Sequence, residues 1–520
     1  MLVIIRTMTV IQKPLFAIVV LLQLFSFPTS ILGQLQFKDA VDKNFKSTLL
    51  LHKEFVSIPN LPPVDPQAML KNINWAAEKY GEVGFTTTLL ESKTFPLLLA
   101  EKVYDPSYKT VLFYFHIDGQ PINPEAWDQE HPFTPVLKEM GEDGKWKKME
   151  WDALDEEVDE DWRIFARAAA DDKAPISMLL TALNILKMEN ETPTFNIKII
   201  FGPEEEYGSY ALLSTLPKYK ERYAADFFIV MDGPAHTSNK PTVTFGCRGI
   251  ASCSITTYGA FTPQHSGHYG NYVPNPVFSL SRLLTSMKDE NGRVLIEDYY
   301  EGIELDDKTQ KVLGSVPYDS VGLNQKLGIY TSEKVGSTYQ ESMQYPSLNV
   351  RQIGTSWKGK GLKTVIPEYA TAHLDLRLVA ETDAKEQTQK VKRHIEKQGY
   401  YVIDRDPTEE ERLSHPKIAK FIFSRGVNAF RTNPDSEFGL KVRTQLTSYF
   451  GEEPVVIRTM GGTVPIIPLI NTLDLPTVIV PMVNMDNNQH SPNENIRIGN
   501  MKQGIHTCLG IISTSFTTAN

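Results

Sequence analysis

Four mainly apolar runs constrain the fold of this chain more than any other feature. They are rich in β-branched and aromatic residues and span Thr110–Phe115, Phe195–Phe201, Phe227–Met231 and Pro476–Pro481. A strand that is apolar at consecutive positions, rather than at every second one, is covered on both faces, as in parallel sheets. Amphipathic stretches such as Gln67–Tyr80 and Pro175–Met188 predict helices around these strands. We therefore expect an α/β domain whose mixed, mainly parallel sheet carries helices on both faces.

The middle third of the chain has a different pattern. Strand-like runs and helical stretches there indicate a compact α+β unit, which we place inside the first domain at residues 241–407. Its expected strands are Val243–Thr257, Tyr369–Val379 and Tyr401–Ile403, and its expected helices are Asn275–Met287 and Lys385–Gly399. Residues 34–240 and 408–520 then form the two parts of the surrounding domain. In the second part, the amphipathic stretches Pro416–Phe430 and Leu440–Phe450 predict helices.

Composition excludes several classes of protein. The chain has 520 residues, with 53 Lys and Arg against 63 Asp and Glu, and a formal charge of −10. It therefore offers no basic surface to nucleic acid or to an anionic membrane. At about 100–200 residues per domain, this length indicates a multidomain protein. Three cysteines cannot build a disulfide framework. On a straight strand, Cys247 and Cys253 would lie about 20 Å apart, too far for a bond.

The N-terminal segment is typical of a secretory signal. Arg6 and Lys13 precede the apolar stretch Leu15–Phe27, and small residues then lead to Gln34. The apolar stretch is shorter than the roughly 20 residues that span a bilayer. We therefore expect residues 1–33 to be a signal peptide rather than a stable membrane anchor, and the mature chain to be secreted or periplasmic. An uncleaved signal anchor is the alternative, and Met8 is an alternative start.

Acidic and histidine side chains follow the ends of the expected strands. They are His116 and Asp118, Glu204–Glu206, Asp232 and His490, together with Asp171 and Asp172 ahead of a helix. Singly, each has an ordinary structural explanation, such as a satisfied polar residue at a strand end, a helix cap or a solvated turn. A parallel sheet, however, gathers its strand ends at the edge where ligands bind. Carboxylates mixed with imidazoles suit zinc, and two ions that share one carboxylate would account for five ligands.

These residues stand in motifs that resemble those of the M20 metallopeptidases, which include carnosinase-type dipeptidases, a carboxypeptidase and acetylornithine deacetylases. The likeness runs from about Trp75 to the C-terminus. The motifs are Phe115-His116-Ile117-Asp118 with Gln120-Pro121, the segment Arg167 to Lys173 around Asp171, Glu205-Glu206-Tyr207-Gly208-Ser209, Asp232, and His490-Ser491. Motifs in this order and spacing are specific, although Ala166, Ala168 and Ala174 replace glycines that are usual in the family. The resemblance implies a catalytic domain of the zinc-peptidase type.

The resemblance also implies roles for these side chains. Asp171 would bridge two zinc ions, with His116 and Asp232 at one ion and Glu206 and His490 at the other. Manganese or cobalt could take the place of zinc. Glu205 would be the general base, taking a proton from water and passing it to the leaving amine. The spacing of His116 and Asp118 puts both on one side of an extended segment, so Asp118 can orient His116. The family has a cis peptide after the bridging aspartate, and we expect one between Asp171 and Asp172.

The inserted unit resembles the lid through which members of the family form homodimers. His265 matches a histidine that reaches the partner subunit's active site and steadies the oxyanion. Arg377 matches an arginine that fixes the substrate's free carboxylate, a task for which a planar guanidinium is suited. Gly461, Gly462 and Thr463 match a Gly-Gly-Ser loop that lines the pocket. A plain loop histidine and a surface salt bridge are the alternatives for His265 and Arg377.

Three functions are consistent with these observations. The favoured one is a secreted dinuclear-zinc hydrolase that cuts the amide bond of short peptides, above all dipeptides. The same centre could instead deacylate N-acyl amino acids, which Arg377 would serve equally well. A catalytically inactive member used for binding or assembly is the third, but an inert site has no physical need for both Glu205 and Glu206. The expected partners are a small substrate and a second copy of the chain.

Overall fold

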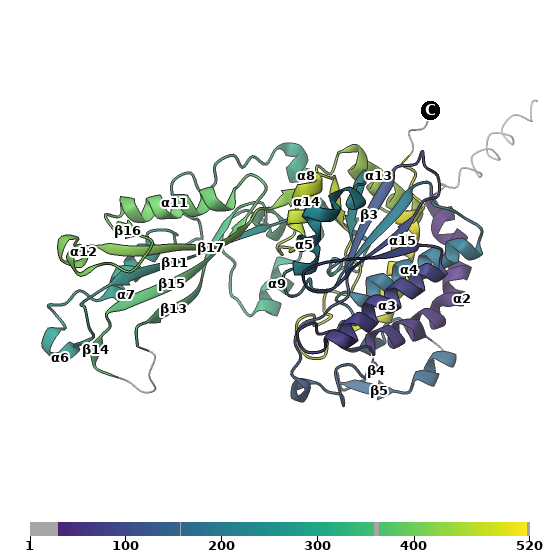
Figure 1. Ribbon diagram of the computed structural model, residues 1–520, viewed down its shortest axis with the longest axis horizontal. Coiled ribbons are helices and arrows are strands. Elements are labelled where there is room, and N and C mark those ends of the chain that lie inside the picture. The colour runs from purple at the N-terminus through teal and green to yellow at the C-terminus, as the bar shows by residue number, and fades with distance from the viewer. Residues whose placement is uncertain (1–29, 157, 358–362, 517–520) are drawn as a thin grey trace, which may run out of the picture.

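An eight-stranded sheet forms the centre of the first of two lobes in the computed structural model, which describes residues 30–156, 158–357 and 363–516 (Figure 1). Its strand order is β1 (Thr86–Leu90), β2 (Leu97–Lys102), β7 (Asn196–Gly202), β3 (Thr110–His116), β8 (Phe227–Val230), β20 (Thr477–Ile479), β9 (Thr242–Thr244) and β19 (Val455–Ile457). The neighbours β7, β3, β8 and β20 are parallel, whereas β1 and β2 are antiparallel at one edge. These parallel strands are the four apolar runs, so the prediction of a mixed, mainly parallel sheet is confirmed.

Consecutive side chains of a strand point to opposite faces of the sheet, and both faces of this sheet are covered. Val111, Phe113 and Phe115 of β3 belong to one apolar core, and Leu112 and Tyr114 belong to the other. The first core is completed by α2 (Ser30–Val56), α3 (Pro66–Glu82), α4 (Lys173–Met188), α13 (Glu437–Phe450) and α15 (Ile498–Ile512). The second is completed by α5 (Tyr210–Tyr219) and α14 (Ile467–Leu473). The expected helices on both faces are therefore present.

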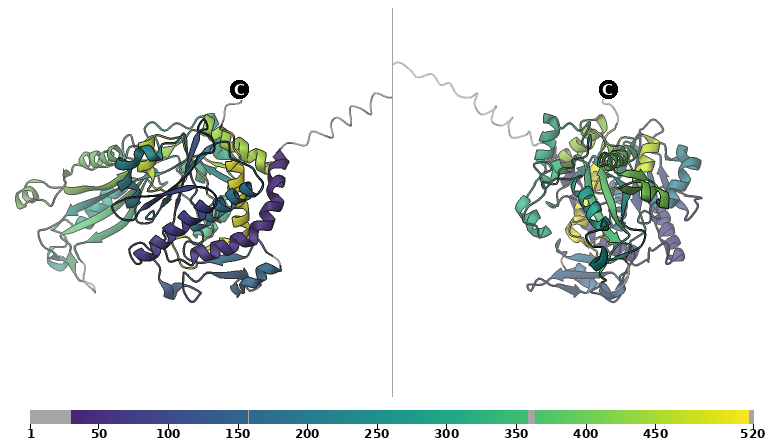
Figure 2. Two further views of the ribbon diagram at one scale, coloured as in Figure 1. Left: turned by 45° about the vertical axis from the view of Figure 1, so that its right-hand side comes forward. Right: turned by 90° about the vertical axis from the view of Figure 1, so that its left-hand side faces the viewer.

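The second lobe extends from one side of the first and is built on a five-stranded sheet (Figures 1 and 2). The strand order is β13 (Ser347–Thr355), β15 (Tyr369–Leu378), β11 (Gly249–Tyr258), β17 (Ile418–Val427) and β16 (Tyr401–Ile403). Its pairs are antiparallel except that of β16 with β17. Helices α7 (Pro276–Thr285) and α11 (Ala384–Lys397) pack on this sheet with their apolar faces. The structure thus contains the expected separate α+β unit.

The prediction from sequence is wrong for two segments. Residues 416–430 have apolar side chains at helical spacing, but residues 418–427 form β17, because pairing with β11 and β16 overrides the local pattern. The five-stranded sheet therefore continues past residue 407, where we placed the end of the inserted unit. The run Val243–Thr257 is three strands rather than one. Its first piece, β9, lies in the eight-stranded sheet, β10 (Gly246–Cys247) pairs with β18 (Phe430–Arg431), and β11 lies in the five-stranded sheet.

The two segments that connect the lobes lie against each other, and glycine makes this possible. A β-carbon on Gly246 would lie 2.4 Å from the carbonyl oxygen of Phe430, and one on Gly249 would lie 2.4 Å from that of Val427. A side chain at either position would push the two segments apart. The placement of the second lobe therefore depends on these two glycines.

The remaining described elements are short. They are α6 (Ser266–Tyr269), α8 (Asp307–Ser315), α9 (Ser320–Leu327), α10 (Tyr339–Ser342), α12 (Glu409–Ser414), β12 (Gln264–His265), β14 (Val365–Ile366), the four-stranded sheet β21 (Asn495–Arg497), β6 (Arg163–Phe165), β4 (Val136–Met140) and β5 (Trp146–Met149), and the 3-10 helices Pro124–Ala126, Trp151–Asp155 and Lys220–Tyr223. The predicted signal core, Leu15–Phe27, lies outside the described residues. Within the described ranges, every helix is too short or too polar to cross a membrane.

Candidate metal centre

The carboxyl ends of three neighbouring strands carry the acidic and histidine residues of the motifs. His116 is the last residue of β3, Glu205 and Glu206 lie in the turn after β7, and Asp232 follows β8. Parallel pairing of β3 with both β7 and β8 puts these ends side by side. Asp171 reaches the same edge from the loop before α4. The structure thus brings together residues that are far apart in the sequence.

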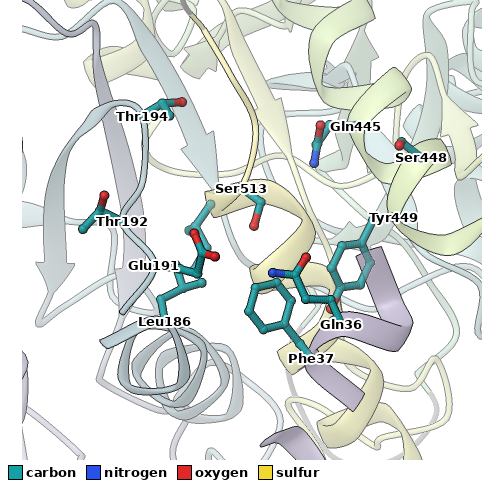
Figure 3. Close-up of a pocket in the computed structure, with 11 residues that line it drawn as sticks. Gln36, Phe37, Leu186, Glu191, Thr192, Thr194, Gln445, Ser448, Tyr449 and Ser513 are labelled. Atoms are coloured by element: carbon teal, nitrogen blue, oxygen red, sulfur yellow. The ribbon is translucent and has the colours of Figure 1, made fainter. Parts of the chain in front are cut away.

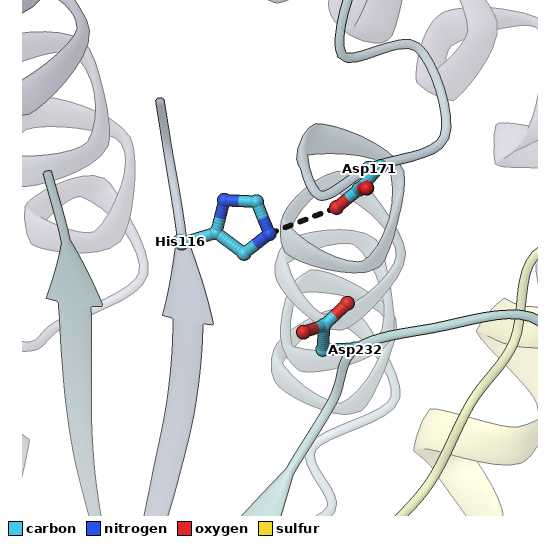
Figure 4. Close-up of side chains that lie close together, drawn as sticks. All are labelled: His116, Asp171 and Asp232. Carbon is cyan, nitrogen blue, oxygen red and sulfur yellow. Dashed lines mark hydrogen bonds and ion pairs between the residues drawn. The ribbon is translucent and has the colours of Figure 1, made fainter. Parts of the chain in front are cut away.

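Two groups of metal-ligating side chains share Asp171. Ligand atoms of His116, Asp171 and Asp232, the first group, all lie within 4.8 Å of one another (Figure 4). Those of the second group, Asp171, Glu206 and His490, also lie within 4.8 Å of one another. Asp171 Oδ1 lies 2.9 Å from His116 Nε2, and Asp171 Oδ2 lies 3.1 Å from His490 Nε2. His490 Nε2 also lies 3.4 Å from Glu206 Oε2. Each oxygen of Asp171 therefore faces a different group, as a carboxylate that bridges two ions must.

The charges of these groups fit divalent cations. Burial raises the pKa of Glu205 well above its ordinary value, and the negative charges of Asp232 and Glu206 raise it further. Burial, reinforced by the charge of Asp171, raises the pKa of Asp232 to about 6 and that of Glu206 to about 7. Crowded carboxylates of this kind hold protons unless cations neutralise them. Hard oxygen ligands combined with imidazole nitrogens are a set that zinc, manganese and cobalt all accept.

Asp118 holds the turn that carries Glu205 and Glu206. Its side chain is fully buried, and its Oδ1 and Oδ2 accept hydrogen bonds from the backbone nitrogens of Glu205, at 2.9 Å, and Glu206, at 3.0 Å. Asp118 Oδ1 also lies 3.4 Å from His116 Nδ1. The sequence predicted that Asp118 lies close to His116. Only the structure shows its hydrogen bonds to the turn that carries Glu205 and Glu206.

The loop before α4 has the geometry that the family resemblance implied. The peptide bond between Asp171 and Asp172 is cis. The buried side chain of Asp172 accepts a hydrogen bond from the backbone nitrogen of His116, at 3.2 Å. Asp172 stands at the N-cap position of α4, but its side chain makes no capping hydrogen bond. Its side chain instead attaches this loop to the end of β3.

Two residues of the site have no role that the sequence predicts. Gln120, which belongs to the first motif, donates a hydrogen bond from Nε2 to Glu206 Oε2 at 2.7 Å. Glu494, in the polar loop that also carries His490, accepts hydrogen bonds from the backbone around Asp171. In the sequence, Glu494 stands out only as a single glutamate among the asparagines of that loop. The family motif there consists of His490 and Ser491, so it did not point to Glu494.

Comparison with known proteins identifies the family. A model of peptidase family M20/M25/M40 matches residues 112–514. The chain belongs to this family. The human beta-Ala-His dipeptidase is 27% identical to it over 419 residues, which cover 79% of this chain and 75% of the relative. The Cys-Gly metallodipeptidase dug1 of Schizosaccharomyces pombe is 27% identical over 421 residues, which cover 79% of this chain and 80% of the relative.

Solved structures show the same architecture. An M20 family metallo-carboxypeptidase from Sulfolobus solfataricus superposes with a TM-score of 0.69 at 25% identity, covering 90% of this chain and 98% of that one. Human carnosine dipeptidase 1 superposes with a TM-score of 0.67 at 24% identity, covering 91% and 97%. The chain is therefore an M20 metallopeptidase of the dipeptidase and carboxypeptidase type, with a candidate dinuclear metal site.

Arg377, which the M20 resemblance assigned to the substrate carboxylate, lies against the loop that it assigned to the lining of the pocket. Arg377 of β15 donates a hydrogen bond from Nη1 to Thr463 Oγ1 at 3.0 Å, and Thr463 Oγ1 donates to the carbonyl oxygen of Arg248 at 2.6 Å. Gly461 and Gly462 precede Thr463 in the loop after β19, and a β-carbon on Gly461 would lie 3.2 Å from Met343 Sδ. The second lobe thus places Arg377 against a loop of the first.

His265 is not part of the metal centre of its own chain. It is the last residue of β12 and directly precedes α6, which lies at the outer end of the second lobe (Figure 1). Its side chain is exposed, and its Nδ1 accepts a hydrogen bond from the backbone nitrogen of Gly267 at 3.0 Å. A function at the active site of a partner subunit, as the resemblance implies, remains a prediction.

A cavity in the first lobe lies away from the metal groups (Figure 3). It is lined by side chains from α2, α13 and α15, including Phe37 and Tyr449, and by Thr192 and Thr194 just before β7. The metal groups lie at the carboxyl ends of the parallel strands, whereas β7 has its amino end at this cavity. The cavity therefore has no part in the metal centre.

Proposed function

We propose that the chain hydrolyses dipeptides that carry a free carboxylate, using two divalent metal ions, of which zinc is the first choice. The observation that carries this proposal is the pair of ligand groups that share Asp171, with Glu205 beside them at one edge of the sheet. The substrate class is supported by Arg377 and by the similarity to two dipeptidases, the human beta-Ala-His dipeptidase and dug1 of fission yeast.

The metal ligands and the general base would be separate residues. His116, Asp171 and Asp232 would hold one ion, and Asp171, Glu206 and His490 the other. The chemistry that two divalent ions would supply there is polarisation of the substrate carbonyl and a more acidic water. Glu205 would take the proton of the attacking water and deliver it to the nitrogen as the C–N bond breaks.

Arg377 would orient the substrate through its C-terminal carboxylate. One terminal nitrogen of its guanidinium is committed to Thr463. A guanidinium has five N–H donors, so others can pair with a carboxylate. An N-acyl amino acid presents the same carboxylate, which is why a deacylase has to be tested beside a dipeptidase.

We extend the proposal to export and assembly. Arg6, Lys13 and the apolar stretch Leu15–Phe27 support a cleaved signal and a secreted or periplasmic protein. The exposed position of His265 at the outer end of the second lobe supports a homodimer in which this residue reaches the partner's site. A residue that acts in another subunit has to lie on the surface of its own.

The test is an activity assay on the mature chain, from Gln34, loaded with zinc. Dipeptides, tripeptides and N-acetyl amino acids are compared, with Glu205→Ala as the inactive control and Arg377→Met as a test of substrate anchoring. We expect turnover of dipeptides, none by Glu205→Ala, and a raised KM for Arg377→Met. Turnover of the acyl compounds alone would indicate a deacylase. No turnover by a protein that binds two metal ions would refute the hydrolase assignment.

A further inference from the structure

Glu494 makes more hydrogen bonds to the loop of Asp171 than any single ligand of the metal groups does. Its side chain is only 1% exposed. Its Oε1 accepts from the backbone nitrogens of Ala170, at 3.1 Å, and Asp171, at 3.0 Å. Its Oε2 accepts from the backbone nitrogen of Ala168, at 3.0 Å, and from Arg167 Nη1, at 2.6 Å. Both oxygens are therefore fully engaged by donors from residues 167–171.

This loop needs such support. Ala168 has φ of 59°, a left-handed conformation that costs an L-residue about 1–2 kcal/mol, and the family usually has a glycine there. The backbone nitrogen of Ala166 also donates to the carbonyl oxygen of Glu494, at 3.2 Å. On the other side, His52 Nε2 lies 3.0 Å from the carbonyl oxygen of Ala169. The loop is thus held by side chains from outside it, and Glu494 contributes most of these contacts.

Glu494 also connects two of the three segments that supply the second metal group, the loop of Asp171 and the loop of His490. It lies in the same polar loop as His490, which itself has a left-handed φ of 62°. That loop is fixed by its asparagines, since Asn487 Oδ1 accepts from the backbone nitrogen of Gln489 at 2.7 Å and Asn493 Oδ1 accepts from that of Asp128 at 2.9 Å. Glu494 therefore fixes the position of the Asp171 backbone relative to the loop that supplies His490.

We propose that Glu494 is a positioning residue of the metal centre, which sets Asp171 between the two groups without binding an ion itself. The inference rests on the proposed function, because it assumes that Asp171 bridges two ions. Four donors occupy the Glu494 carboxylate, so it has no free direction toward a metal. A neutral side chain cannot replace it, because four converging N–H groups require an acceptor on both sides.

The test is a zinc titration of the metal-free protein by calorimetry, which reads binding rather than activity. The wild type should bind two equivalents. Glu494→Gln keeps the volume but presents an NH2 group to two N–H donors, and we expect it to weaken zinc binding by about 10–100-fold. Glu494→Asp keeps the charge and withdraws the carboxylate from the Asp171 loop, so we expect it to weaken zinc binding as well.

The two variants separate positioning from the burial of a charge. If Glu494 served only to neutralise Arg167, then Glu494→Asp would bind two zinc ions as tightly as the wild type, and the inference would be overturned. Glu494→Asp also decides the question if Glu494→Gln does not fold. The matched control is Glu381→Gln, which breaks the ion pair with Arg431 of β18, at the connection between the lobes, and should leave zinc binding unchanged. An equal loss in this control would overturn the inference too.

A wild-type protein that binds fewer than two zinc ions would contradict the proposed function instead. Two bound ions in the wild type with unaltered binding in both Glu494 variants would contradict the positioning role alone. The two failures are therefore distinguishable in one set of titrations.

Discussion

Replacing Asp118 with asparagine tests how the turn that carries Glu205 and Glu206 is held in place. The Asp118 carboxylate accepts hydrogen bonds from the backbone nitrogens of Glu205 and Glu206, one at each oxygen. The carboxamide of Asp118→Asn has the same size but a single acceptor oxygen. One of the two backbone nitrogens would then face an NH2 group, in a position that solvent does not reach because Asp118 is fully buried.

The magnitude follows from these contacts. A hydrogen bond to a charged group contributes about 1.5–3 kcal/mol, and the variant loses one of the two. At about 1.4 kcal/mol per tenfold change in rate, a loss borne entirely by the transition state lowers kcat/KM by about 10–150-fold. The decrease should fall mainly on kcat, because the turn carries the proposed general base and a proposed metal ligand rather than the proposed substrate carboxylate site.

The assay is steady-state hydrolysis of a dipeptide by zinc-loaded wild type and variant. Asp226→Asn is the matched control, since Asp226 accepts a hydrogen bond from the backbone nitrogen of Thr110, at 2.8 Å, at the opposite end of β3. Its side chain is 40% exposed, so water can replace the lost contact and activity should hold. A kcat/KM of Asp118→Asn within about threefold of wild type would refute the reasoning.

Two other predictions concern the partner subunit and pH. His265→Ala and Glu205→Ala should each be inactive. An equal mixture that exchanges subunits should recover about a quarter of wild-type activity, because about half of the dimers are mixed and each mixed dimer has one complete site. No recovery would contradict a role of His265 in the partner's site. Burial lowers the pKa of His52, which lies between Ser177 Oγ and the carbonyl oxygen of Ala169, to about 3. The unfolded chain binds this proton below about pH 6.5, so His52 by itself lowers the free energy of unfolding by about 1.4 kcal/mol per pH unit as the pH falls from 6.5 toward 3. His52→Gln should remove this contribution from the pH dependence of the free energy of unfolding, measured in urea on the metal-free protein. A pH dependence equal to that of the wild type would show that His52 makes no such contribution.

The sequence alone determined the architecture of the first lobe and the chemistry at its edge. Short runs that are apolar at consecutive positions and rich in β-branched residues favour strands covered on both faces, and those runs are the parallel strands β3, β7, β8 and β20. Because the ends of parallel strands meet, the order of strands and motifs along the chain was enough to place His116, Glu206 and Asp232 at one edge. Local pattern suffices where burial on both faces leaves few alternatives.

Only the tertiary structure decided the features that depend on contacts between distant segments. Residues 418–427 have a helical pattern, yet pairing with β11 and β16 makes them a strand. Close approach at Gly246 and Gly249 accompanies the division of one apolar run among three sheets. The four hydrogen bonds of Glu494 join segments that are more than 320 residues apart. No local pattern encodes such contacts, because their energy arises only when the folded chain brings donor and acceptor together away from water.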